Sequence, residues 1–228
     1  MRRAIKRIES LEFLSRIALS QGEYIKAKEL AQKSLAIYKK FDYSSGIFLS
    51  LNLLGHAARH LGQYAEAKEL HQEVLQTCKS LDYPLGVTLA SYSLGYLAYL
   101  VGDHAEAKRL LCERLEIAKR LAYQHGVARS LNLMGNVAYV SGEYQEAEQY
   151  LYQALKTTQA VPMMLEIVTS LAKVILAEGR PEQARELLAF VLNHTGSTKE
   201  TRDNASRLWA ELVAELPDQM ITVAQEKR

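Results

Sequence analysis

The stretch GEYIKAKEL at residues 22–30 returns with few changes as GQYAEAKEL at 62–70, GDHAEAKRL at 102–110 and GEYQEAEQY at 142–150. Each step is 40 residues, and a fifth copy, GRPEQAREL at 179–187, follows after a step of 37. A fixed period of this length is typical of repeat proteins, in which each copy is one supersecondary unit that stacks on the next. The sequence therefore predicts five repeated units.

Each unit is predicted to be a pair of antiparallel helices. In the second unit, Leu51, Leu54 and Ala58 recur at steps of three or four residues, which is the spacing of an amphipathic helix. This spacing predicts a first helix at roughly 47–61 and a second at roughly 63–81. The glycine between them suits a tight turn, because a left-handed backbone conformation costs glycine little.

Small residues recur in register inside both helices of the pair. The first helices carry glycines and the second helices carry alanines: Gly55, Gly95 and Gly135, and Ala27, Ala67, Ala107, Ala147 and Ala184. Glycine inside a helix costs about 1 kcal/mol relative to alanine, so we expect these columns to mark a seam where two backbones approach closely. A further glycine column is expected in the connector before each first helix: Gly46, Gly86 and Gly126.

This pattern resembles the tetratricopeptide repeat. The residues that carry the resemblance in the second unit are Leu54, Gly55, Ala58, Gly62, Tyr64 and Ala67. The 40-residue period is longer than the commonest form, and alanine replaces the large aromatic residue that the family usually has late in the first helix. The longer unit is similar to repeats of bacterial signalling proteins, including peptide-responsive regulators and the sensor arms of signal-transduction ATPases. The resemblance implies an all-α, right-handed α-solenoid of five helix-turn-helix repeats plus a C-terminal capping helix.

One solenoid domain is expected at residues 1–216. Its repeats are placed at about 6–45, 46–85, 86–125, 126–163 and 164–196. A capping helix is expected at 197–216, because Ser197 and Glu200 have the spacing of a capping box. Residues 217–228 are interpreted as a tail.

The composition excludes several classes of protein. The 28 Lys and Arg nearly balance 26 Asp and Glu, for a formal net charge of +2, which argues against a protein that collects polyanions. No window approaches the ~18 apolar residues of a membrane span, and no secretory signal pattern is present. A cytoplasmic protein without membrane contact is therefore expected, in which Cys78 and Cys112 stay reduced thiols.

The candidate binding site follows from the resemblance. If the first helices line a concave face, the residues on them that lie off the buried seam form a peptide groove. The predicted peptide-binding residues are Asn52, His56, Arg59, Tyr92, Tyr96, Tyr99, Arg129, Asn132, Asn136, Tyr139 and Lys173. Asparagine can pair with the backbone of an extended segment, tyrosine gives contact area at low entropic cost, and the cations attract carboxylates. The alternative is that these residues only solvate the face, or that the tyrosines pack between helices.

No catalytic, cofactor or metal site is predicted. The sequence has no glycine-rich phosphate loop, nucleophile elbow or His-Glu-x-x-His motif. His56 and His60 have a spacing that can hold a metal ion, but no third ligand is evident.

The sequence therefore predicts a non-catalytic protein–protein interaction module that binds an extended peptide or partner segment in its concave groove. The alternative is a ligand- or signal-sensing arm of a larger bacterial signalling ATPase or transcriptional regulator, with a small molecule or peptide at the tyrosines. Other domains of a parent chain would then be partners, and a homodimer is left open. Single-stranded nucleic acid could stack on the tyrosines, but the low net charge argues against it.

Overall fold

The structure is a computed structural model that describes the backbone of residues 2–215 and the side chains of residues 10–214. This part of the chain forms eleven α-helices and no strand, as the repeat pattern predicts. The helices fall into two compact units, one that ends at Leu121 and one that begins at Ala122. The predicted tail at 217–228 and the last residue of the predicted cap lie outside the described residues, and the single-domain boundary stays a prediction.

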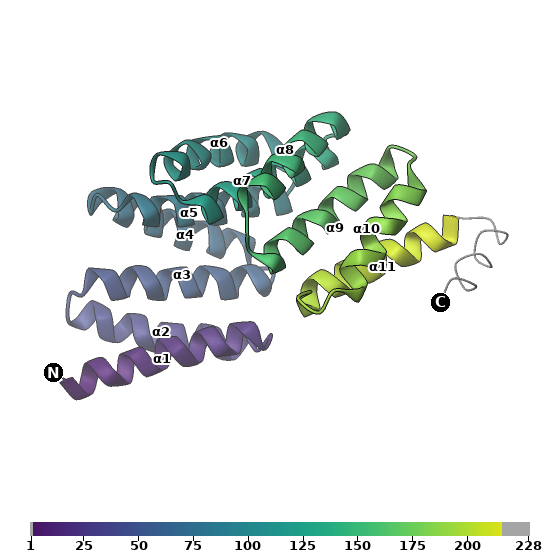
Figure 1. The fold of residues 1–228 in the computed structure, drawn as a ribbon. Coiled ribbons are helices and arrows are strands. Elements are labelled where there is room, and N and C mark those ends of the chain that lie inside the picture. Colours follow the sequence, from purple (N-terminus) through teal and green to yellow (C-terminus); the bar gives the residue numbers. More distant parts are fainter. Residues whose placement is uncertain (1, 216–228) are drawn as a thin grey trace. The chain divides into compact units, whose positions relative to one another are not determined.

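The first unit contains three helix pairs. They are α1 (Arg2–Ser20) with α2 (Tyr24–Lys40), α3 (Ser44–His60) with α4 (Tyr64–Ser80), and α5 (Pro84–Leu100) with α6 (His104–Arg120). Consecutive helices pack against each other in antiparallel fashion (Figure 1), and the first helices of neighbouring pairs also touch.

The second unit contains two helix pairs and one further helix. The pairs are α7 (Gln124–Val140) with α8 (Tyr144–Thr157), and α9 (Val161–Ala177) with α10 (Pro181–Asn193). The last helix, α11 (Lys199–Glu215), packs on both α9 and α10, so it covers the last pair as a capping helix would. Among residues 2–215, no helix has the length and apolar character required to cross a bilayer.

The cap of α11 differs from the expected capping box. The backbone N–H of Thr201 donates to Oγ1 of Thr198 at 3.1 Å, so Thr198 is the N-cap residue. The Ser197 hydroxyl instead donates to the carbonyl of Val191, at the end of α10. The expectation that Ser197 caps the helix is therefore wrong, because its hydroxyl is used to tie the connector to the preceding helix.

Left-handed residues end the helices in both kinds of turn. Within each pair, the turn residue is a glycine with φ between 75° and 81°: Gly22, Gly62, Gly102, Gly142 and Gly179. Between pairs of the first unit, Asp42 and Asp82 take φ values of 49° and 46°, and Ala122 takes 51° at the start of the second unit. Glycine is thus reserved for the turn inside the pair.

The small-residue seam is confirmed. A Cβ atom on Gly55 would lie 2.6 Å from the His71 ring, and one on Gly135 would lie 2.7 Å from the Leu151 side chain. The five alanines of the second helices are fully buried. Any larger side chain at these places would force the paired helices apart.

The prediction that a column of glycines lies in the connectors is wrong. Gly46, Gly86 and Gly126 lie in the first turn of α3, α5 and α7. The physical reason is a tyrosine ring that packs over the start of each helix, since a Cβ on Gly46 would lie 2.3 Å from the ring of Tyr38. The glycine there makes room for an aromatic ring and does not mark a break in the helix.

Candidate functional site

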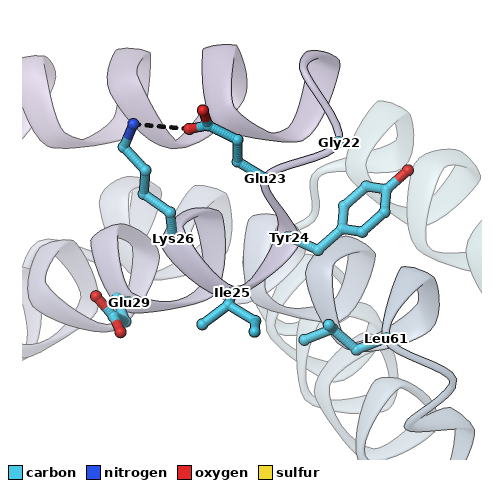
Figure 2. Close-up of a pocket in the computed structure, with 7 residues that line it drawn as sticks. All are labelled: Gly22, Glu23, Tyr24, Ile25, Lys26, Glu29 and Leu61. Atoms are coloured by element: carbon cyan, nitrogen blue, oxygen red, sulfur yellow. Dashed lines mark hydrogen bonds and ion pairs between the residues drawn. The ribbon is translucent and has the colours of Figure 1, made fainter.

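Two open hollows lie at the turn ends of the helix pairs. One has a volume of about 460 Å³ and is lined by Gly22, Glu23, Tyr24, Ile25, Lys26, Glu29 and Leu61. Figure 2 shows it, with the Glu23–Lys26 ion pair at one edge. The other, of about 490 Å³, is lined by the equivalent residues of the fourth repeat: Gly142, Glu143, Tyr144, Gln145, Glu146 and Glu178. Because the same hollow recurs at the same repeat position, it follows from the way one turn packs on the next, and nothing in it marks a selective site.

The predicted tyrosine row is present on α5 in the first unit. The ring centroids of Tyr92 and Tyr96 lie 6.2 Å apart, and those of Tyr96 and Tyr99 lie 6.1 Å apart. All three side chains are partly exposed. Cations flank the row, with the Arg59 guanidinium 5.0 Å from the Tyr96 centroid and the Arg114 guanidinium 4.7 Å from the Tyr92 centroid. The row is therefore a partly accessible aromatic surface beside positive charge.

Arg114 lies beneath this aromatic surface, and sequence reasoning missed it. It belongs to the second helix α6 and is only 1% exposed. Its Nε donates to the carbonyl of Thr88 on α5 at 2.8 Å, which holds the side chain across the helix pair. The signal in the sequence is that the other repeats have only small or apolar residues at this position: Ser34, Val74, Ala154 and Val191.

On α3, the predicted residues face a buried histidine. His56 is partly exposed and meets the fully buried ring of His71, with 5.2 Å between the centroids. Neither ring nitrogen of His71 has a hydrogen-bond partner among the described residues. Burial, together with the nearby charges of His56 and Arg59, lowers the pKa of His71 to about 3. His71 is therefore neutral at ordinary pH.

The histidine pair considered as a metal site does not converge on one point with other ligands. His60 stacks on Tyr24 at the turn end of the pair, with centroids 4.4 Å apart. Its Nε2 lies 2.7 Å from Nη2 of Arg59. Within the described part of the chain, no three residues of metal-binding type cluster together.

In the second unit, the two predicted asparagines bind the neighbouring helix. Nδ2 of Asn132 donates to Oε1 of Glu166 at 3.0 Å, and Nδ2 of Asn136 donates to Oγ of Ser170 at 3.3 Å. The Oδ1 atom of Asn132 is buried without a hydrogen-bond partner in the described residues, and so is that of Asn52, its equivalent in the second repeat. The donors of Asn132 and Asn136 are therefore used within the fold, and the unpaired oxygens of Asn52 and Asn132 lie buried.

The remaining predicted residues of this unit form two charged pairings. Burial raises the pKa of the Glu166 carboxyl, while the charge of Arg129 and the hydrogen bond from Asn132 oppose that rise. Lys173 Nζ lies 4.3 Å from the ring centroid of Tyr139. Burial lowers the pKa of Lys173, and the charge of Glu211 on α11 opposes that shift. Glu166 was not in the predicted site, although it and Lys173 are the two charged residues of α9.

Solved structures with this fold include two described as peptide complexes. The chain is similar to the Rap conjugation gene regulator of the plasmid pLS20 in complex with the Phr* peptide, with a TM-score of 0.81, 16% identity, and coverage of 99% of this chain and 65% of that chain. It is similar to NprR in complex with its cognate peptide NprX, with a TM-score of 0.79, 16% identity, and coverage of 98% and 66%. It is also similar to BtubC from P. vanneervenii, with a TM-score of 0.68, 19% identity, and coverage of 95% and 85%. At these identities the likeness concerns the fold.

Sequence profiles identify the repeat directly. One profile described as a tetratricopeptide repeat matches residues 46–120 and 87–160, and two others with that description match 7–40 and 168–189. A comparison with curated proteins finds no match. The first profile alone covers more than half of the chain, over helix pairs with the expected glycine turns and alanine seam. The chain belongs to the tetratricopeptide repeat family.

Proposed function

We propose that this protein is a non-catalytic interaction module whose first helices bind an extended peptide or a segment of a partner protein. The observation that carries the proposal is the row of three partly exposed tyrosines on α5, with the partly exposed Arg59 beside it. Tyrosine and arginine are among the residues enriched where binding energy concentrates in protein interfaces. The proposal also places the protein in the cytoplasm, consistent with two free cysteines.

The polar groups of the first helices support a peptide over a charged polymer. The helices α3, α5, α7 and α9 carry just four charged residues: Arg59, Arg129, Glu166 and Lys173. These four helices lack the track of cations that a nucleic-acid backbone requires, whereas α1 carries five Lys and Arg residues. The partly exposed amides of Asn52 and Asn136 can instead pair with backbone groups of an extended chain.

The solved relatives support the same reading. The Rap regulator and NprR are each described in complex with a peptide. They share the fold with this chain at low identity, so the binding of a peptide is transferred to this chain as a proposal.

Peptide selection with point variants tests the proposal. Random decapeptides are selected from a display library against the intact chain, and the dissociation constant of each selected peptide is measured by fluorescence anisotropy. Tyr96→Ala tests the first unit and Asn132→Ala tests the second, and each is expected to weaken its peptides at least tenfold, about 1.4 kcal/mol. Circular dichroism melts check that the variants keep their helices.

The matched control is Tyr152→Ala, which removes an exposed tyrosine from the second helix α8. This variant is expected to bind within twofold of the unaltered chain. The proposal fails if no peptide is selected, or if Tyr96→Ala and Asn132→Ala bind every selected peptide as tightly as the control.

A further inference from the structure

The tyrosine row on α5 lies in surroundings that carry almost no charge. Arg59 is the one formally charged residue of α3, and α5 has none. Among the described side chains of α1, the single acid is Glu12, and its Oε1 atom is buried. The helices α3 and α5 therefore favour an uncharged ligand segment over an acidic or a basic one.

The polar groups beside the row are mainly hydrogen-bond donors. Arg59 has only N–H groups to offer, and each tyrosine hydroxyl carries one O–H donor. Asn52 is partly exposed, but its Oδ1 atom is buried, so this acceptor is out of reach of a ligand. Neither α3 nor α5 carries a carboxylate that could accept an N–H group. A ligand with many backbone N–H groups would therefore leave some of them unpaired on this surface, which costs binding free energy.

Proline-rich chains have the complementary set of groups. Proline has no backbone N–H, while its carbonyl still accepts hydrogen bonds. Such chains form the polyproline II helix in water, without internal hydrogen bonds, so their carbonyl groups stay available. Because this helix exists before binding, little conformational entropy is lost when it docks on aromatic side chains.

The tyrosine rings are also held in place before a ligand arrives. The ring planes of Tyr92 and Tyr96 differ by 19° with centroids 6.2 Å apart, and Tyr99 continues the row at 6.1 Å. The guanidinium of Arg114 lies 4.7 Å from the Tyr92 centroid and is fixed by its hydrogen bond to the carbonyl of Thr88. A surface that is already ordered loses little side-chain entropy on binding.

We propose that Tyr92, Tyr96 and Tyr99 bind a proline-rich segment in the polyproline II conformation. The proline rings pack on the tyrosine rings, and the tyrosine hydroxyls and Arg59 donate hydrogen bonds to carbonyl groups of the segment. The inference rests on the proposed function, because it names the class of peptide that the first unit binds.

The test uses the intact chain and two labelled decapeptides with acetylated and amidated ends, whose binding is measured by fluorescence anisotropy. One is decaproline, and in the other alternate prolines are replaced by alanine, which restores N–H groups and weakens the polyproline II helix. Decaproline is expected to bind at least tenfold more tightly. Because neither peptide is charged, raising sodium chloride from about 50 to about 500 mM is expected to change the dissociation constant less than twofold.

Variants of the central tyrosine test which residues bind the segment. Tyr96→Ala is expected to weaken decaproline binding at least tenfold, because it removes both the ring and the hydroxyl. Tyr96→Phe keeps the ring, so its dissociation constant is expected to lie between those of the unaltered chain and Tyr96→Ala. The matched control is Tyr152→Ala on the second helix α8, which is expected to bind decaproline within twofold of the unaltered chain. Circular dichroism melts check that each variant keeps its helices.

Two outcomes overturn the inference. One is that decaproline binds no more tightly than the alanine-containing peptide. The other is that Tyr96→Ala binds decaproline as tightly as Tyr152→Ala does. Either result leaves the proposed function standing if Tyr96→Ala or Asn132→Ala weakens peptides selected from the display library, whereas the absence of any such peptide contradicts the proposed function itself.

Discussion

At residue 71, a histidine occupies a core position that the other repeats fill with apolar side chains. The equivalent residues are Ala31, Leu111, Leu151 and Leu188, and all of them are fully buried, as His71 is. The imidazole packs against Gly55 on the seam, where a leucine packs against Gly95 in the next repeat. The core thus accepts leucine at this position elsewhere in the same chain, which gives an internal reference for the cost of the histidine.

The low pKa of His71 predicts that the chain loses stability in mild acid. Burial, with smaller contributions from the charges of His56 and Arg59, lowers this pKa from 6.5 to about 3, so between those values the unfolded chain binds a proton that the folded chain does not. The free energy of unfolding therefore falls as the pH decreases through this window, by about 2 kcal/mol at pH 5. His71→Leu should remove this part of the pH dependence. Urea unfolding at pH 7.5 and pH 5.0 measures it, and an equal loss of stability in both proteins would contradict the prediction.

At the scale of the helix pair, one residue of a connector has a strained backbone conformation. Ala122 has a φ of 51°, a left-handed conformation that costs an alanine about 1–2 kcal/mol. Ala122→Gly removes this cost while adding entropy to the unfolded chain, so it is expected to stabilise the protein by about 0.5–1 kcal/mol. Asp82→Gly should stabilise it less, because aspartate tolerates the left-handed conformation better. The shift in urea midpoint measures both changes, and a destabilised Ala122→Gly variant would refute the strain argument.

The helix boundaries show how much of the fold can be predicted from the sequence. The 40-residue period and the three-or-four-residue spacing predict two helices in each repeat. The start of α3 at Ser44, three residues before the predicted 47, was missed because Gly46 was interpreted as part of a connector. Only the packing of the Tyr38 ring over that glycine explains why it lies inside the helix.

The candidate site was predictable to the level of a helix face. The spacing of Tyr92, Tyr96 and Tyr99 predicted one aromatic row, and the structure contains it. The same reasoning could not find Arg114, because its side chain reaches the row from the second helix. Nor could it show that Asn132 donates to Glu166, since that bond joins residues 34 positions apart in different repeats.

At the scale of the whole molecule, a repeat protein buries each helix pair against its neighbours. A residue in the first repeat is therefore less buried than its equivalents in later repeats. Leu14 on α1 is 49% exposed, while its equivalent Leu54 on α3 is 4% exposed. The later equivalents, Leu94, Met134 and Leu171, are buried too. Among the described residues, nothing packs over this face of α1, whereas Ala31 of the preceding pair covers the position of Leu54 in the second repeat.

This difference predicts unequal effects from one chemical change. Leu54→Ala is expected to cost about 2–5 kcal/mol, because it opens a cavity in a packed core. Leu14→Ala is expected to cost less than about 1 kcal/mol, since much of the side chain already contacts water. Urea unfolding of the two variants under one condition compares them directly. If Leu14→Ala destabilises the protein as much as Leu54→Ala does, then the face of α1 is covered in solution. Sedimentation at several concentrations would then show whether a second copy of the chain covers it, because self-association makes both the mass and the measured stability depend on concentration.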